Sequence, residues 1–468
     1  MKKTILALTA LTAWAHGASA QNTLKATVKD KENGETLIGV TAKVDGTDIT
    51  AVSDSDGNIT ISNIPDGERS ITFSYVGYEE KTERMSFPLT DDGTVTITMG
   101  EDEEELEEIT VQTTRGTRSI KNIPTRVEFI SGEELDEKSS MKPGDIRMLL
   151  NESTGITTQQ TSAISGNAAI RIQGLDGRYT QILKDGFPTF AGAASGLGLL
   201  QTPPLDLRQV EIIKGSSSTL YGGGAIAGLV NLISKTPGEK RELNFLLNGT
   251  SGRGLDASAF YSRKFGKVGT TMLFSYNRNW AYDPSDTGFT AIPEFDRFTF
   301  NPKLFLYFSE NTDMNIALNT MYEDRLGGDI EYVRGRGSDV HAYFERNITQ
   351  RHSLQAALQH RFSGRSRLTV KASGTYYDRS LEVPGYEFDG RQVSTFSEAA
   401  FTHTKERSEW VTGLNLWTDD FNEKHAGTAG KRDYVQTVAG AFVQNTWAAT
   451  EWLDVESGLR ADHVTDYG

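Results

Sequence analysis

The amino-acid sequence predicts a mainly β protein in three parts: a small N-terminal β-sandwich, a compact α+β segment, and strands of a transmembrane β-barrel. Three observations predict this fold class. Residues 23–99 form short β-prone runs separated by turns, residues 122–237 mix strands with Gly-rich turns and a helix, and residues 243–468 alternate apolar and polar positions. Because successive side chains of a strand point to opposite faces, this alternation gives each barrel strand one lipid-facing row.

Composition excludes several classes of protein. The chain has 468 residues, 48 Lys and Arg, 63 Asp and Glu, a formal net charge of −15 and no cysteine. The acidic excess argues against a nucleic-acid partner, which needs a basic surface. The lack of cysteine excludes disulfide frameworks, thiol nucleophiles and Cys-ligated metal sites. After residue 20 no apolar run approaches the roughly 18 residues of a membrane helix, which excludes a helical membrane protein.

The N-terminus has the order of a secretory signal. Lys2 and Lys3 precede an apolar run over residues 5–14, and the small residues 18–20 precede Gln21. The apolar run is too short to span a bilayer. We therefore expect a signal peptide over residues 1–20, a mature chain that begins at Gln21, and a location outside the cytoplasm of a bacterium.

Residues 21–100 are predicted to form the β-sandwich. Residues 54–58 superficially resemble a calcium loop, but the loop lacks a ligand position and the bidentate Glu at its end, so a hairpin turn is the preferred interpretation and a metal site the alternative. The predicted strands are residues 25–29, 41–44, 59–61, 70–76 and 94–99.

An acidic run separates the sandwich from the rest of the chain. Seven of the eight residues 101–108 are acidic, so this stretch repels itself and stays extended. Residues 109–113 follow as a β-prone stretch with no evident hairpin partner. They are either a linker or an edge strand available to another protein's sheet.

The middle segment is predicted as α+β. A helix is expected over residues 144–150, because Ile146, Leu149 and Leu150 share one side. The predicted strands are residues 126–130, 169–173, 180–183, 210–214 and 229–234.

About a dozen alternating segments follow residue 243. Leu453, Val455 and Leu459, for example, share a face opposite Asp454 and Glu456. A soluble sandwich also alternates, but aromatic residues near the segment ends favour the interfacial girdles of a membrane barrel. These aromatic residues are Tyr276, Trp280, Phe308, Trp410, Trp417, Trp447 and Trp452.

The middle segment resembles the plug domain of TonB-dependent outer-membrane receptors. The sequence IRIQGL at residues 170–175 leads to KDGFP at 184–188, where the family has an Ile-Arg-Gly strand and an Asp-Gly turn. A more specific match runs through VEIIKG at 210–215, STLYG at 218–222 and LVNLISK at 229–235. Lys184, Lys214 and Ser216 depart from the family pattern. The residues that carry the match are Arg171, Gly174, Asp185, Gly186, Glu211, Lys214, Gly215, Tyr221, Gly222, Gly228 and Asn231.

The resemblance implies the remaining organisation. Residues 21–100 are similar to the carboxypeptidase-regulatory-like domain of Bacteroidetes-type receptors, residues 101–118 become an acidic linker with a TonB box, residues 119–238 the plug, and residues 239–468 part of a 22-stranded outer-membrane barrel. The N-terminal domain is then expected in the periplasm. The TonB box is placed at Glu108, Ile109, Thr110, Val111 and Gln112.

Length is the one conflict with this resemblance. At roughly 20 residues per strand and connection, 22 strands need on the order of 440 residues, whereas 230 residues follow Gly238. The sequence is therefore expected to be a C-terminally truncated receptor with open barrel edges.

The resemblance implies TonB-dependent import of a scarce small molecule, first of all a ferric siderophore or related metal chelate. The expected partners are TonB with its inner-membrane energising complex, outer-membrane lipid and the ligand. The candidate ligand contacts are Gln159, Gln160, Phe187 and Phe190. Import of a glycan, haem or cobalamin, or a non-transporting β-rich surface binding protein, are the alternatives.

No enzyme activity and no cofactor is expected. His403 and Glu406 have a His-x-x-Glu spacing, but they lie on an alternating strand without a convincing third ligand. The glycines of residues 222–228 are out of register for a dinucleotide fingerprint, and tight turns explain them better.

Overall fold

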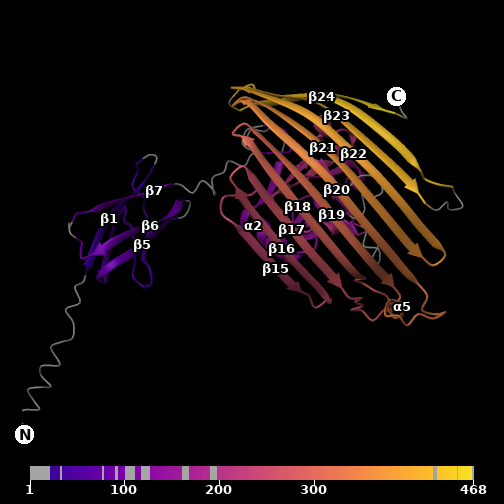
Figure 1. Ribbon diagram of the computed structural model, residues 1–468, viewed down its shortest axis with the longest axis horizontal. Helices are drawn as coiled ribbons and strands as arrows, with labels where there is room; N and C mark the ends of the chain where they lie inside the picture. The colour runs from indigo at the N-terminus through magenta and orange to yellow at the C-terminus, as the bar shows by residue number, and fades with distance from the viewer. Residues whose placement is uncertain are drawn as a thin grey trace, which may run out of the picture. The chain divides into compact units, whose positions relative to one another are not determined.

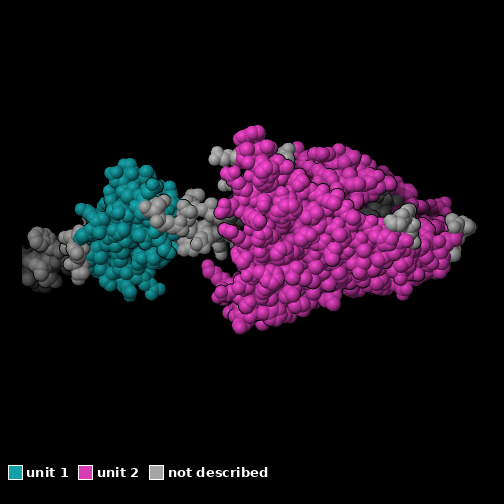
Figure 2. Space-filling model, turned by 90° about the horizontal axis from the view of Figure 1, so that it is seen from above, with its two compact units in different colours: residues 1–109 teal, residues 110–468 magenta. Residues whose placement is uncertain are grey.

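The computed structural model describes residues 22–31, 34–75, 78–89, 93–100, 111–116, 127–160, 168–189, 198–424, 430–450 and 452–465. The chain divides into two compact units, residues 1–109 and 110–468 (Figure 2). The predicted signal peptide and the acidic run lie outside the described residues. No helix among the described residues is long and apolar enough to cross a membrane.

The first unit is a β-sandwich of two small sheets, ordered β4-β1-β7 and β3-β2-β5-β6. Alternate residues of its strands point into one core, in which Leu24, Val28, Ile71 and Phe73 are fully buried. The strands are β1 (Asn22–Asp30), β2 (Thr41–Val44), β3 (Thr50–Val52), β4 (Asn58–Ile64), β5 (Gly67–Tyr75), β6 (Tyr78–Phe87) and β7 (Val95–Met99).

Sequence analysis missed β3 and β6. The first has only three residues, and the second carries charged residues along an edge of its sheet, where they discourage pairing with other chains. Residues 54–58 form a turn between β3 and β4, but these strands belong to different sheets, so the prediction of a hairpin is wrong. One carboxylate oxygen of Asp54 accepts the backbone N–H groups of Asp56 at 3.0 Å and Asn58 at 2.8 Å. This carboxylate oxygen therefore stabilises the backbone of the turn, as the turn interpretation expects, rather than facing a metal ion.

The second unit contains a five-stranded sheet, ordered β12-β11-β14-β13-β8, and the hairpin β9–β10. Its core is aliphatic, with Ile146, Val210, Ile212 and Val230 fully buried. The elements are β8 (Val127–Ser131), α2 (Gly132–Met141), α3 (Arg147–Asn151), β9 (Ile156–Gln160), β10 (Ala168–Ile172), β11 (Thr180–Lys184), β12 (Phe187–Pro188), β13 (Leu207–Lys214), α4 (Ser218–Tyr221) and β14 (Gly228–Ser234).

The expected strands of this segment are present with small shifts, but four elements were missed: α2, β9, and the short α4 and β12, which have only four and two residues. Helix α2 buries only Leu135 and Ser139, so its polar sequence carries no amphipathic signal. Strand β9, which carries the candidate ligand contacts Gln159 and Gln160, pairs with β10 from Ile156 to Gln160. The predicted helix over residues 144–150 is the shorter α3.

A sheet of eleven antiparallel strands forms a wall beside the plug sheet in the described chain, with neighbours in sequence order (Figure 1). Its strands are β15 (Glu242–Gly249), β16 (Gly254–Phe265), β17 (Val268–Asn279), β18 (Glu294–Ser309), β19 (Thr312–Gly328), β20 (Phe344–Ser363), β21 (Ser366–Val383), β22 (Tyr386–Lys405), β23 (Ser408–Glu423), β24 (Tyr434–Ala448) and β25 (Asp454–Val464). The longest connections, residues 280–293 and 329–343, lie at one end of the wall. Two-residue turns such as 310–311 and 364–365 lie at the other, which we call the short-turn end. Short turns are typical of the periplasmic end of bacterial outer-membrane barrels.

The wall is polar inside and apolar outside, the reverse of a soluble core. Asn277, Glu323 and Thr349 are buried on the inward face, whereas Leu354 and Leu414 remain largely exposed on the outward face. This is the pattern of a lipid-facing barrel wall. One predicted girdle residue was misplaced: Trp417 pairs directly with the buried Phe396 across β22 and β23, so it faces inward.

The core of the first unit makes a stability prediction. Phe73→Ala in the isolated residues 22–100 removes a fully buried ring, and we expect it to lower the free energy of unfolding by about 3–5 kcal/mol. Urea titration followed by circular dichroism measures this change. Val52→Ala, at a side chain that is 61% exposed, is the control and should change stability by less than about 0.5 kcal/mol. Equal effects of the two substitutions would contradict the assigned core.

Candidate functional site

Residues 111–116, here called the anchored segment, directly follow the predicted TonB-box residues Glu108, Ile109 and Thr110, which lie outside the described residues. The segment is a turn rather than a β-strand. Val111 is fully buried in a cluster with Ile213 of the plug sheet. Residues 109–113 were expected to be either a linker or an extended edge strand. The edge-strand alternative is wrong for Val111 to Thr113, the part of this range that the structure describes, because these residues are docked on the plug.

Glu211 on β13 holds the anchored segment. Its buried carboxylate accepts the backbone N–H of Gln112 at 2.9 Å, the backbone N–H of Thr113 at 2.7 Å and the Thr113 hydroxyl. Burial raises the pKa of Glu211, although these hydrogen bonds oppose the rise. A carboxylate that accepts several donors at once fixes the segment to the centre of the plug sheet.

Two further motif residues meet the same segment. The Tyr221 hydroxyl donates to the backbone carbonyl of Thr113 at 2.6 Å, and burial raises the pKa of this tyrosine. The side-chain amide of Asn231 lies 3.4 Å from the Thr113 hydroxyl, while its oxygen accepts the backbone N–H of Gly186 at 3.0 Å. Glu211, Tyr221 and Asn231 thus lie around one threonine, a convergence that their spacing in the sequence does not show.

Arg115 joins the anchored segment to the wall. Its guanidinium forms a buried ion pair with Glu398 of β22, with Nε 2.9 Å from one carboxylate oxygen, and donates to the Leu220 carbonyl at 2.7 Å. The same group lies over the rings of Tyr221, at 4.2 Å, and Phe442 of β24, at 4.9 Å. Sequence analysis missed Arg115. Its position directly before Gly116 was the one feature of the sequence that could have pointed to it.

The wall also binds the backbone of this segment. Arg367 of β21 donates to the carbonyls of Arg115 at 3.0 Å and Gly116 at 2.9 Å, and the Thr402 hydroxyl donates to the Arg115 carbonyl at 2.9 Å. Val111 to Gly116 are therefore held by plug and wall at once, and any displacement of the segment must break both sets of contacts.

The Asp185-Gly186 turn forms a second plug-to-wall contact. Both residues have positive φ, 53° and 74°, as the tight hairpin between β11 and β12 requires. Asp185 accepts the Ser234 backbone N–H and hydroxyl and pairs with Lys303 of β18, each at 2.9 Å. Burial alone would raise the pKa of Asp185, but Lys303, the Ser234 N–H and Lys184 outweigh it and hold this pKa at about 2.

The remaining motif residues shape the plug itself. Lys214 pairs with Glu128 and donates to the Thr154 carbonyl. Gly228 has φ 155°, and a Cβ there would meet the Ile213 carbonyl oxygen. Gly174, Gly215 and Gly222 also have positive φ, and Arg171 donates to the Gln159 side chain at 2.9 Å.

The candidate ligand contacts are not gathered in one place by the structure. Gln159 is exposed on β9, and the Gln160 side chain and Phe190 lie outside the described residues. Phe187 is only 1% exposed, with its ring edge-on to Phe396 at 6.3 Å, so it cannot meet a ligand from this position. Phe187 was predicted to contact a ligand because it is a large aromatic residue beside a turn, and the sequence does not show that Phe396 of the wall packs against it.

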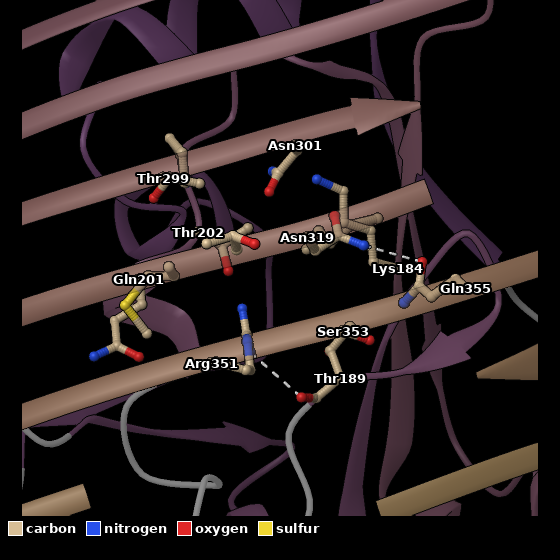
Figure 3. A pocket seen from close by; sticks show the side chains of 14 residues that line it. Lys184, Thr189, Gln201, Thr202, Thr299, Asn301, Asn319, Arg351, Ser353 and Gln355 are labelled. Carbon is tan, nitrogen blue, oxygen red and sulfur yellow. Dashed lines mark hydrogen bonds between the residues drawn. The ribbon is translucent and has the colours of Figure 1, made fainter. Parts of the chain in front are cut away.

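A small polar cavity lies between the plug and strands β18, β19 and β20 (Figure 3). The Arg351 side chain reaches the Thr189 carbonyl at 3.4 Å, and Asn319 donates to Gln355 at 3.1 Å. The cavity has a volume of about 30 Å³, which holds water rather than a chelate. Its labelled lining residues are Lys184, Thr189, Gln201, Thr202, Thr299, Asn301, Asn319, Arg351, Ser353 and Gln355.

The His403 and Glu406 pair gains no further ligand. His403 Nδ1 lies 2.9 Å from the Ser366 hydroxyl, and no group of three or more His, Cys, Asp or Glu side chains able to hold a metal occurs in the described ranges.

Comparison with sequence families assigns two domains. Residues 119–229 match the TonB-dependent Receptor Plug Domain, and residues 24–111 match the CarboxypepD_reg-like domain. The Iron-regulated outer membrane virulence protein of Vibrio cholerae is 22% identical over 373 residues, which cover 75% of this chain and 53% of that protein. TonB-dependent receptor P3 of Formosa agariphila is 24% identical over 234 residues, 50% of this chain and 22% of that receptor. The chain spans about half the length of the Vibrio cholerae relative.

Solved structures share the fold. The ferric yersiniabactin uptake receptor FyuA of Yersinia pestis matches with a TM-score of 0.61 at 15% identity, covering 76% of this chain and 59% of that one. The alcaligin receptor FauA of Bordetella pertussis matches with a TM-score of 0.61 at 17% identity, covering 74% and 56%. The ferric citrate transporter FecA matches with a TM-score of 0.58 at 13% identity, covering 73% and 56%. With both domains matched and a plug held against a barrel-like wall, the chain has the plug, the N-terminal domain and the fold of the TonB-dependent outer-membrane receptors.

Proposed function

We propose that this receptor imports a ferric siderophore or a related metal chelate across the outer membrane, driven by TonB. The names of its relatives support the ligand class, since they include an iron-regulated outer-membrane protein and uptake receptors for ferric yersiniabactin and ferric citrate. The anchored segment supports the coupling. It connects the predicted TonB box to the plug through Glu211 and to the wall through Arg115.

In this proposal TonB pairs with Ile109 and Thr110 by adding a strand, a mode in which main-chain hydrogen bonds provide the affinity. A pull on these residues passes to Val111 and Thr113 and then to β13, because Glu211 binds two consecutive backbone N–H groups there. The inner-membrane energising complex supplies the work. The N-terminal domain lies on the periplasmic side, and outer-membrane lipid surrounds the wall.

Ligand recognition is proposed for the exposed side of the plug, with Gln159, Gln160 and Phe190 as candidate contacts. Phe187 is not among these contacts, because the wall covers its ring. The cavity beside Arg351 is too small for a chelate, so it is interpreted as a hydrated seam between plug and wall.

The TonB box can be tested apart from the anchored segment. Ile109→Pro removes a backbone N–H needed for strand addition, so uptake of radiolabelled iron as a ferric siderophore should fall to the level of cells without TonB. Binding of the same chelate to de-energised cells should stay unchanged. Glu103→Pro in the acidic run is the matched control and should transport normally. Normal uptake by Ile109→Pro would reject the box.

The role of Glu211 has its own test. Glu211→Gln keeps one acceptor oxygen and turns an amide group toward the remaining donor, which leaves a backbone N–H of Gln112 or Thr113 unpaired. We expect amide hydrogen exchange at these two residues to accelerate roughly tenfold or more, since a lost buried hydrogen bond costs about 1–3 kcal/mol. Mass spectrometry of the exchanged peptides measures this rate. Glu133→Gln on the exposed face of α2 is the control, and unchanged exchange in Glu211→Gln would contradict the assignment.

A further inference from the structure

An open hollow of about 600 Å³ lies on the wall across strands β22 to β24 and the turns 364–365 and 406–407, at the short-turn end. We call it the rim pocket. It is separate from the plug and from the anchored segment. Its lining includes Arg365, His403, Lys405, Arg407, Trp410 and Trp447.

Strand register places the rim pocket on the outward face. Ser366, His403, Trp410 and Asn445 stand directly opposite one another across the four strands. Thr402, the neighbour of His403, points inward to the backbone of the anchored segment, so His403 and its row point outward. The pocket therefore opens toward the surface that the membrane covers.

The lining combines aromatic rings with positive charge. Trp410 is 46% and Trp447 49% exposed, so both rings are available to lipid. Arg365 and Arg407 are exposed on the adjoining turns and Lys405 at the end of β22, and Glu406 is the one acidic residue among the lining side chains. Tryptophan prefers the level of the lipid headgroups, and arginine and lysine bind phosphate there.

Apolar residues continue from the pocket along the same face. Phe401 lies two residues from His403 on β22 and is 37% exposed, and Leu414 lies four residues from Trp410 on β23 and is 64% exposed. A soluble phosphate would meet the cations and leave these side chains uncovered. A phospholipid would place its phosphate at the cations and its acyl chains on the apolar rows.

We propose that the rim pocket binds the phosphate-bearing headgroup of an anionic phospholipid from the periplasmic leaflet of the outer membrane. Charge complementarity and the continuous apolar rows select this occupant. The guanidinium groups of Arg365 and Arg407 and the Lys405 ammonium hold the phosphate, while Trp410 and Trp447 pack against the glycerol and upper acyl region. The proposal does not depend on which molecule the receptor imports.

Titration of the detergent-solubilised protein with brominated phosphatidylglycerol, followed by tryptophan quenching, tests the site. Quenching should reach half its maximum at a lower lipid concentration than with brominated phosphatidylcholine. Simultaneous Arg365→Gln, Lys405→Gln and Arg407→Gln should raise that concentration roughly tenfold or more for phosphatidylglycerol alone. These substitutions lie on exposed turns and at the exposed end of β22, and heat-modifiable migration on gels checks that the variant is folded.

The matched control removes three exposed cations elsewhere at the same end, through Lys240→Gln, Arg241→Gln and Arg263→Gln, and should leave the titration unchanged. Native mass spectrometry, which counts retained phosphatidylglycerol, provides a readout independent of tryptophan. Equal quenching by both lipids, or an equal loss in both triple variants, would overturn the proposal. Competition by glycerol 3-phosphate or inorganic phosphate at similar concentrations would also overturn it, because the pocket would then bind free phosphate.

Discussion

The buried ion pair between Arg115 and Glu398 is the contact on which the arrangement of plug and wall depends. Removing one partner of such a pair leaves an unpaired buried charge and costs about 3–5 kcal/mol, although the intact pair adds little net stability. Separating the two charges is therefore too costly for thermal motion alone, but a directed pull on the segment can supply a free energy of this size. It also explains why Arg367, Thr402 and Leu220 converge on the same short segment, since each one satisfies a polar group that burial would otherwise leave unpaired.

The polar inner face of the wall follows from the same requirement. A plug with charged turns can be enclosed only by a surface that pairs those charges, as Lys303 does for Asp185 and Arg297 does for the carbonyl of Gly144. The outer face contacts lipid, where polar groups would be unpaired, and it therefore carries apolar side chains. Three motif residues of the plug, Glu211, Tyr221 and Asn231, all contact Thr113, the residue directly after the predicted TonB box, and so hold it on the plug.

Sequence reasoning was strongest where one local pattern determines structure. The β13 and β14 strands were predicted because apolar, β-branched runs stand between glycine turns, and the wall strands because alternation persists over their whole length. It failed where a distant partner decides. Arg115 and Glu398 are 283 residues apart, and Phe187 became a wall contact only because Phe396 faces it. Trp417 was predicted to be a girdle residue because it is aromatic. It shares a face with Asn415, which is buried, and lies opposite Leu414 and Leu416, which are exposed, so the alternation already placed it inward.

The proposed coupling to TonB predicts that the anchored segment leaves the wall during transport. Because the chain has no cysteine, a single engineered disulfide can test it. A Cβ on Gly116 would lie 3.1 Å from Cδ of Glu409 on β23, so Gly116→Cys with Glu409→Cys puts one thiol on the anchored segment near another on the wall. Uptake of radiolabelled ferric siderophore should stop when this pair is oxidised and return on reduction, with binding unchanged throughout and each single variant insensitive to oxidant. Equal uptake in the oxidised and reduced double variant would contradict the claim.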